Sequence, residues 1–367
     1  MFHSVFMIVI LSIIFLIVII IYVFMLQPQF GGKPTHKELK EMQASPNYKN
    51  GQFQNFSYTP QLTGDGNIFK IMRKFFFDRD KENKPSTILP SHKTDLFKLN
   101  IHEDILVWFG HSSYFMQLDG KSVLVDPVLS GHASPVKFTT KSFKGTDVYT
   151  TDDIPAIDFL LITHDHYDHL DYETIMKLKP KIKTVITGLG VGAHFRRWGF
   201  EEKMIFENDW NQEVKFDELL FSTTPARHFS GRSFRRNTSL WLSFVITTQT
   251  KKIFVGGDSG YDSHFKTIGE KFGPFDLVIL ENGQYNQYWK FIHMMPAEVV
   301  QAAEDLNAKK LFPVHWGKFS LSLHAWDEPI RQVMNETKDK DLVVLHPMIG
   351  EAVRIDDVDT FNQWWNL

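Results

Sequence analysis

The chain has 367 residues, 43% hydrophobic and 14% aromatic, so it can bury a substantial core in one large α/β domain with extensions or in more than one domain. Its formal net charge of −3, with no basic excess, argues against a nucleic-acid-binding protein. The absence of cysteine excludes disulfides and thiolate metal ligands and leaves the redox compartment open.

The first predicted element is a transmembrane helix over residues 5–26, after a short tail of residues 1–4. This stretch carries no charge, and at ~1.5 Å per residue it can cross a bilayer core of ~30 Å. We expect it to remain uncleaved because it lacks the basic start and the small-residue cleavage site of a signal peptide. Lys33, Lys37 and Lys40 follow the span, and no Lys or Arg precedes it. This predicts a single-pass protein of the cell membrane with the bulk of the chain in the cytoplasm.

Residues 27–96 are predicted to be a linker and pre-domain segment, because glycine, proline and asparagine recur there in patterns typical of turns. Within it, the stretch FKIMRKFFF at residues 69–77 mixes apolar bulk with cations. Two interpretations stay open: a segment in the membrane interface beside the anchor, or a helix packed on the following domain.

The remaining residues, 97–367, are predicted to form one domain. Residues 114–118 and 122–125 flank Asp119-Gly120, which is a strong signal for a tight hairpin. Strands come first in runs and then alternate with helices, an order that favours an α/β fold with two packed sheets and outer helices. The other predicted strands are 105–109, 157–163, 184–187, 214–216, 219–223, 240–248, 253–255, 277–280, 310–314 and 342–345, and the predicted helices are 171–179, 193–198, 297–306 and 329–335.

A loop directly after the predicted strand 157–163 carries His164, His166, Asp168 and His169. Such groups are seldom buried without partners, and imidazole nitrogen with carboxylate oxygen suits zinc or a similar divalent ion. Alternate residues of an extended segment face one side, so His164 and His166 can bind one ion. A turn can bring Asp168 and His169 to a second ion beside it. The alternatives are a solvated His-rich loop or a single structural metal.

Three further polar residues stand where apolar strands end, namely His228, Asp258 and His315. Each fits a strand that presents one ligand at its tip, although each taken singly could equally be a satisfied polar group. Together with the loop they give five histidines and two aspartates. That set suits two ions with three ligands each and a bridge between them.

The arrangement resembles the metallo-β-lactamase fold and, more narrowly, its N-acylphosphatidylethanolamine phospholipase D-like branch. The His164 loop is typical of the whole superfamily, and the flanking motifs favour the branch. The resemblance covers residues 31–355. The matching stretches are SPNYKNGQF at 45–53, WFGHSS at 108–113, VDPV at 125–128, PARH at 225–228, GDSGY at 257–261, His293 with PAE at 296–298, and HWG at 315–317.

The resemblance implies a metallo-β-lactamase-like αβ/βα sandwich with two metal ions, expected to be zinc. It places His164, His166 and His228 on one ion, Asp168, His169 and His315 on the other, and Asp258 as the bridge. Asp168, Asp258 and His293 are the expected catalytic residues. Supporting or pocket roles fall to His111, Asp126, Tyr261 and His324; the first two would orient a ligand imidazole, unless they are merely structural.

The activity that the resemblance implies is hydrolysis of N-acylphosphatidylethanolamine to an N-acylethanolamine and a phosphatidate, with a metal-bridging hydroxide as nucleophile. Asp258 would accept a proton from the nucleophile, and His293 is the candidate acid for the leaving group. The expected partners are a phospholipid substrate and the membrane, without nucleic acid; a homodimer is left open. One alternative is a lactonase or phosphoesterase for a soluble metabolite, with phosphate contacts from Arg227, Arg232, Arg235 and Arg236. Another is a catalytically dead, membrane-tethered binding protein.

Overall fold

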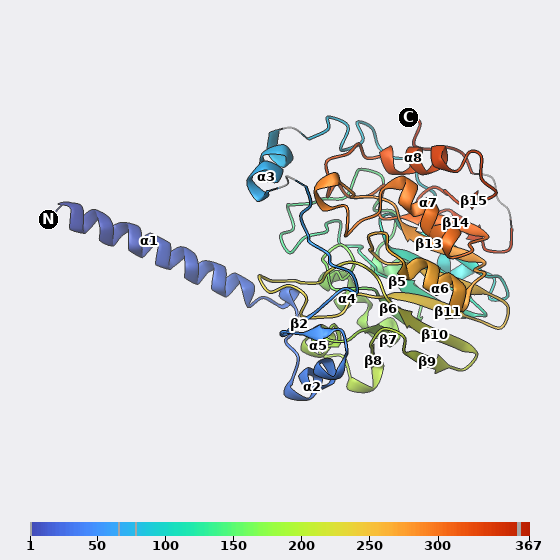
Figure 1. Ribbon diagram of the computed structural model, residues 1–367, viewed down its shortest axis with the longest axis horizontal. Coiled ribbons are helices and arrows are strands. Elements are labelled where there is room, and N and C mark those ends of the chain that lie inside the picture. Colours follow the sequence, from blue (N-terminus) through green and yellow to red (C-terminus); the bar gives the residue numbers. More distant parts are fainter. Residues whose placement is uncertain (1, 65–66, 78, 358–360) are drawn as a thin grey trace.

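The computed structural model describes residues 2–64, 67–77, 79–357 and 361–367. The remaining positions, 1, 65–66, 78 and 358–360, fall in the predicted tail, linker and domain and lie outside the described residues. Two seven-stranded sheets pack face to face, and helices cover their outer faces (Figure 1). The α/β sandwich predicted from the sequence is confirmed.

The first sheet has the order β16-β3-β4-β5-β6-β7-β8. Strands β16 to β5 pair antiparallel, and β5 to β8 pair parallel. The predicted Asp119-Gly120 hairpin is confirmed, because Tyr114 of β4 pairs with Val125 of β5. The strands are β3 (Ile105–Trp108), β4 (Tyr114–Leu118), β5 (Lys121–Val125), β6 (Ile157–Ile162), β7 (Ile182–Gly188), β8 (Ile205–Asn208) and β16 (Ala352–Arg354).

The second sheet has the order β15-β14-β13-β12-β11-β10-β9. Its strands β12 to β15 pair parallel, and β9 to β12 pair antiparallel. The strands are β9 (Glu213–Phe216), β10 (Leu219–Thr224), β11 (Ser243–Thr247), β12 (Lys252–Val255), β13 (Leu277–Glu281), β14 (Lys310–Val314) and β15 (Val343–Val344).

Both faces of each sheet are buried, because alternate side chains of a strand point to opposite sides. In β12, Ile253 and Val255 join the core between the sheets, while Phe254 packs under the outer helices. Helices α4 (Tyr172–Leu178) and α5 (Gly192–Arg197) contribute to the outer core of the first sheet. Helices α6 (His264–Phe272), α7 (Pro296–Asp305) and α8 (Glu328–Glu336) contribute to that of the second sheet.

The stretch predicted as linker is well structured. It contains α2 (His36–Ala44), the short hairpin of β1 (Tyr48–Lys49) and β2 (Gln52–Phe53), and α3 (Ile68–Phe77). Met42 and Phe53 join the central core, so this part of the chain packs on the sandwich.

Helix α1 (Phe2–Met25) projects away from the sandwich by itself (Figure 1). Its residues 5–25 are long and apolar enough to cross a membrane, a criterion that a signal sequence also meets, and none of them is buried. Helix α3 also has an open apolar side. It buries Ile71 but leaves Phe69 and Phe77 each 81% exposed.

Candidate metal centre

The site lies where the carboxyl ends of strands from both sheets meet. His111 follows β3, Asp126 follows β5, and the loop with His164 follows β6 in the first sheet. His228, Asp258 and His315 follow β10, β12 and β14 of the second sheet.

Three of these strand ends turn sharply into left-handed backbone. The φ angles of His111, Asp126 and His315 are 54°, 41° and 68°. Aspartate tolerates this region better than most residues, and histidine is enriched there. The turns place each residue at the end of its strand, where the two sheets converge.

One group of ligand atoms comes from His164, His166, His228 and Asp258, and these atoms all lie within 4.8 Å of one another. Nε2 of His164 lies 2.9 Å from Nδ1 of His166, which lies 3.3 Å from Nε2 of His228. Since His228 Nδ1 donates to the carbonyl of Ile292 at 2.8 Å, its Nε2 is left as the acceptor that faces the group.

A second group comes from His111, Asp168, His169 and His315, again within 4.8 Å of one another. His111 contacts the Asp168 carboxylate at 2.9 Å, and the ring centroids of His111 and His315 lie 4.1 Å apart. His111 therefore lies against both the Asp168 carboxylate and the His315 imidazole.

Asp258 lies between the two groups. Its Oδ2 is 3.2 Å from His169 Nε2 and 3.6 Å from His228 Nε2, and its Oδ1 is 3.2 Å from His315 Nδ1. Oδ2 thus lies between members of both groups and Oδ1 faces the second group, which gives the carboxylate the position of a bridge.

Neighbouring polar groups hold the imidazoles in orientation. Asp126 accepts hydrogen bonds from the backbone N–H and the hydroxyl of Thr163, and its Oδ2 lies 2.8 Å from His169 Nδ1. This contact turns His169 Nε2 toward the centre. Ser112 was not predicted; its hydroxyl lies 2.8 Å from His315 Nδ1. Ligand imidazoles of metal sites are commonly oriented in this way.

The electrostatics fit a cation at the centre. Burial, and then neighbouring imidazoles, lower the pKa of His164 well below its usual value, which leaves a neutral ring with a free lone pair. Burial alone would raise the pKa of Asp258, but the imidazoles of His169 and His315 hold it well below its usual range. His169 Nε2 and Asp258 Oδ1 are buried and lack a hydrogen-bond partner within the described ranges. Divalent ions would satisfy both atoms.

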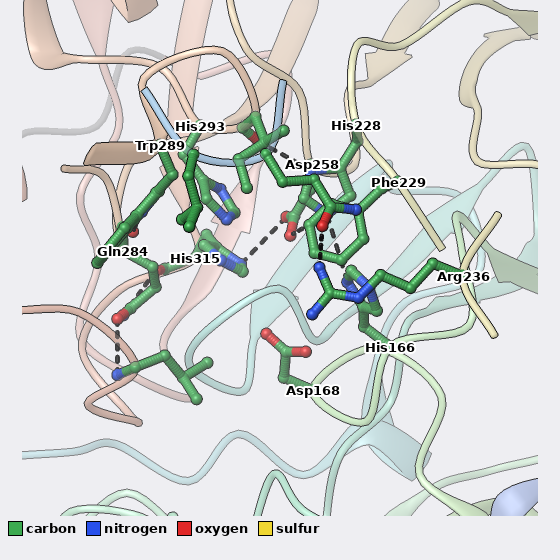
Figure 2. A pocket seen from close by; sticks show the side chains of 14 residues that line it. His166, Asp168, His228, Phe229, Arg236, Asp258, Gln284, Trp289, His293 and His315 are labelled. Carbon is green, nitrogen blue, oxygen red and sulfur yellow. Dashed lines mark hydrogen bonds and ion pairs between the residues drawn. The ribbon is translucent and has the colours of Figure 1, made fainter. Parts of the chain in front are cut away.

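These groups form the floor of a cleft of about 520 Å³ (Figure 2). Among the described residues that line it, Arg236 is the only lysine or arginine. Its guanidinium bonds the Gln61 side chain and lies 5.2 Å from the ring of Phe229. Most of the remaining lining residues are apolar or belong to the two His/Asp groups. They are Leu62, His166, Asp168, His228, Phe229, Asp258, Gln284, Trp289, Ile292, His293, His315 and Leu321.

His293 lines the cleft, with its ring centroid 5.1 Å from that of His228 and 5.2 Å from that of His315. Its Nδ1 lies 3.3 Å from the carboxylate of Glu281 at the end of β13. Burial raises the pKa of Glu281 to about 7. Burial also opposes charge on His293, but the Glu281 carboxylate outweighs it and raises the His293 pKa. Sequence reasoning missed Glu281, although it ends an apolar strand just as His228 and Asp258 follow one.

The other two predicted supporting residues, Tyr261 and His324, are not among the described residues that line the cleft. Tyr261 donates its hydroxyl to Asp305 at 2.7 Å. His324 accepts from the backbone N–H of Gln284, which does line the cleft.

The four arginines considered for phosphate contacts have different environments. Arg227 binds the carbonyls of Tyr58 and Tyr261, and Arg232 is buried against backbone carbonyls. Arg235 is exposed, and Arg236 reaches the cleft.

Comparisons with known proteins agree with this fold. A family model described as "Beta-lactamase superfamily domain" matches residues 121–316. An uncharacterized protein from Mycobacterium tuberculosis is 36% identical over 327 residues, which cover 88% of each chain. A Caenorhabditis elegans protein named N-acyl-phosphatidylethanolamine-hydrolyzing phospholipase D 1 is 28% identical over 331 residues, covering 83% of this chain and 91% of the relative.

The fold is also similar to that of solved structures. Igni18, a metallo hydrolase from the archaeon Ignicoccus hospitalis, aligns with a TM-score of 0.53 and 21% identity. The alignment covers 68% of this chain and 97% of that protein. At this level of identity the likeness concerns the fold alone.

Proposed function

The chain belongs to the beta-lactamase superfamily, and we propose that it is a membrane-anchored zinc phosphodiesterase. Its substrate is N-acylated phosphatidylethanolamine, which it hydrolyses to an N-acylethanolamine and a phosphatidate. The observation that carries the proposal is the pair of His/Asp groups, joined by Asp258, on the floor of a largely apolar cleft.

In this proposal each group would hold one divalent ion. His164, His166 and His228 would hold the first ion, Asp168, His169 and His315 would hold the second, and Asp258 would be shared between them. When bound, such ions lower the pKa of water toward neutrality and polarise a phosphoryl oxygen.

The protein groups then orient the reactants and move protons. Asp258 faces both ligand groups, so it can orient the attacking water and take up its proton. His293 is held through Nδ1 by Glu281, which leaves Nε2 to protonate the departing alkoxide. Neither step requires a nucleophilic side chain.

The cleft lining supports a phospholipid substrate. Leu62, Trp289 and Leu321 offer apolar contacts for acyl chains, and Arg236 offers one cation for a phosphodiester. A small phosphorylated metabolite would more typically require several cations. The name of the Caenorhabditis elegans relative favours the same substrate class.

The N-terminal elements support access from a lipid surface. Helix α1 offers a candidate span, and α3 lies beside the cleft: Lys70 and Lys74 lie 5.3 and 5.1 Å from the ring of Tyr288, which precedes the lining residue Trp289. With Phe69 and Phe77 exposed next to these lysines, α3 has the composition of an interfacial helix on an anionic bilayer.

The test is lipid turnover by the full-length protein, purified in detergent and loaded with zinc. We expect mass spectrometry to detect an N-acylethanolamine and a phosphatidate in equal amounts, and metal analysis to give close to two ions per chain. Turnover of lactones or soluble phosphate esters with the lipid left intact would refute the substrate. A purified chain without metal and without any turnover would support a binding protein instead.

A further inference from the structure

The loop of the metal centre comprises residues 164–170 and is called the metal loop. One side of it carries the ligand groups, and the other side faces the residues directly after α1. The side chains of His164, His166 and Asp168 belong to the ligand groups. The residues between them contact other parts of the protein: the ring of Tyr167 lies 6.3 Å from that of Phe30, and the Asp165 carbonyl is bound by Arg232.

Arg232 lies at the centre of this contact and is only 4% exposed. Its Nη1 donates to the carbonyls of Asp165 and Leu170 at 2.8 and 2.7 Å, one near each end of the metal loop. Its Nε and Nη2 donate to the carbonyl of Gln29 at 3.0 and 2.8 Å. The guanidinium also lies 4.1 Å from the Tyr167 ring centroid.

Such an environment is costly for an arginine. Within the described residues no Asp or Glu lies at ion-pair distance from it, and burial lowers its pKa. The planar guanidinium, however, donates to three carbonyls in one fixed geometry. Its geometry therefore joins the segment at Gln29 to the metal loop.

A second path runs through His194. The backbone N–H of Gly32 donates to His194 Nδ1 at 3.0 Å, so the ring hydrogen lies on Nε2, which is 3.1 Å from the Asp165 carboxylate. That carboxylate also accepts from Ser239 and from the N–H of Gly231. Asp165, between two metal ligands, is thus fixed from the same segment.

The segment over residues 26–32 is held almost wholly through its backbone. Arg197 binds the carbonyls of Leu26 and Gly31, and Trp198 binds that of Pro28 at 2.8 Å. The fit is close, because a Cβ on Gly32 would lie 2.0 Å from the carbonyl oxygen of Ala193.

We propose that Arg232 is a positioning residue that ties this juxtamembrane segment to both ends of the metal loop, so that docking of the segment sets how firmly the centre retains its metal. The inference rests on the proposed metal centre but not on the lipid substrate. Residues that orient metal ligands typically change metal affinity by ~10–100-fold when replaced.

The test measures the rate of metal loss to a chelator from the zinc-loaded, full-length protein in detergent. Arg232→Gln removes the tie, and Gly32→Ala undocks the segment while leaving every residue of the loop unchanged. We expect at least ~10-fold faster loss for each. The two effects should be less than multiplicative in the double variant, because both changes break the contact between Arg232 and the Gln29 carbonyl. Arg232→Lys should restore part of the retention.

Gln29→Ala is the matched control. The Gln29 side chain bonds only that of Gln27 among the described residues, and the carbonyl that Arg232 binds is unchanged. Trypsin cleavage at Lys33 reports undocking, and circular dichroism reports folding. If Gly32→Ala fails to fold, Arg197→Gln weakens the same docking from the opposite side.

The outcomes separate the two proposals. A segment that becomes open to trypsin while metal is lost at the wild-type rate would overturn the inference. Faster metal loss from the variants, in a protein that does not hydrolyse lipid, would uphold the inference and refute only the substrate. A wild-type chain that takes up no metal would overturn the metal centre and this inference together.

Discussion

Replacing Asp258 with asparagine tests the whole centre, because its carboxylate lies against both ligand groups. Oδ1 lies 3.2 Å from His315, and Oδ2 lies 3.2 Å from His169 and 3.6 Å from His228. Asparagine keeps one oxygen but puts an amide N–H₂ in place of the other, and that donor cannot bind a cation. We therefore expect Asp258→Asn to bind close to one ion per chain and to lose at least ~100-fold in kcat, or about 2.7 kcal/mol of transition-state stabilisation.

The assay pairs metal analysis with lipid turnover by mass spectrometry. Asp276→Asn is the control, because Asp276 precedes β13 at the opposite end of the sheet and binds Lys252 and Lys309 there. It should keep both ions and full activity. An Asp258→Asn protein that retains two ions and turns over within threefold of wild type would refute the bridging position.

Three further expectations follow from single residues. Arg236→Gln should raise KM for the phosphodiester by ~10-fold or more with a smaller change in kcat, because Arg236 lines the cleft. Arg235→Gln should change neither constant. Equal effects of the two substitutions would mean that these arginines act only through the net charge of their loop. His293→Gln should lower kcat strongly for an alkoxide leaving group but little for a nitrophenolate, which leaves without a proton; equal losses would exclude it as the acid. Burial lowers the pKa of His264 to about 4, so its neutral form stabilises the fold above the unfolded pKa of 6.5, and up to about 3 kcal/mol is lost as pH falls toward 4. Urea unfolding of wild type and His264→Gln at pH 7 and pH 4.5 should show a smaller pH effect in the variant, and identical pH effects would contradict this assignment.

The metal loop is predictable from sequence because its ligands are neighbours in the chain. Within one short loop, local geometry alone brings His164 and His166 together. His228, Asp258 and His315 are recognisable only as polar ends of apolar strands, since their meeting depends on how the two sheets pack. The pattern of buried strands and outer helices gives the architecture, whereas short elements such as β16 escape detection because their pairing partner, β3, is distant in sequence.

Arg232 and Arg236 show why the remainder is not predictable. They stand four residues apart in one basic loop, yet one is buried and the other reaches the cleft. The partners of Arg232 are backbone carbonyls, which every residue type carries, so no sequence pattern marks them. Glu281 is a similar case, because its role depends on its contact with His293, which lies in a separate loop.

The centre also joins the two sheets. The backbone N–H of His315 donates to the carbonyl of His111, whose own N–H donates to the carbonyl of Trp316. Both histidines occupy left-handed backbone, a conformation that costs on the order of 1–3 kcal/mol per residue and persists only where the surroundings fix it. Two buried atoms without hydrogen-bond partners among the described residues, His169 Nε2 and Asp258 Oδ1, lie in this centre. His169 follows a strand of the first sheet and Asp258 follows a strand of the second. Metal ions would bond to these atoms from both sheets at once. The free energy of metal binding would therefore also stabilise the packing of one sheet on the other.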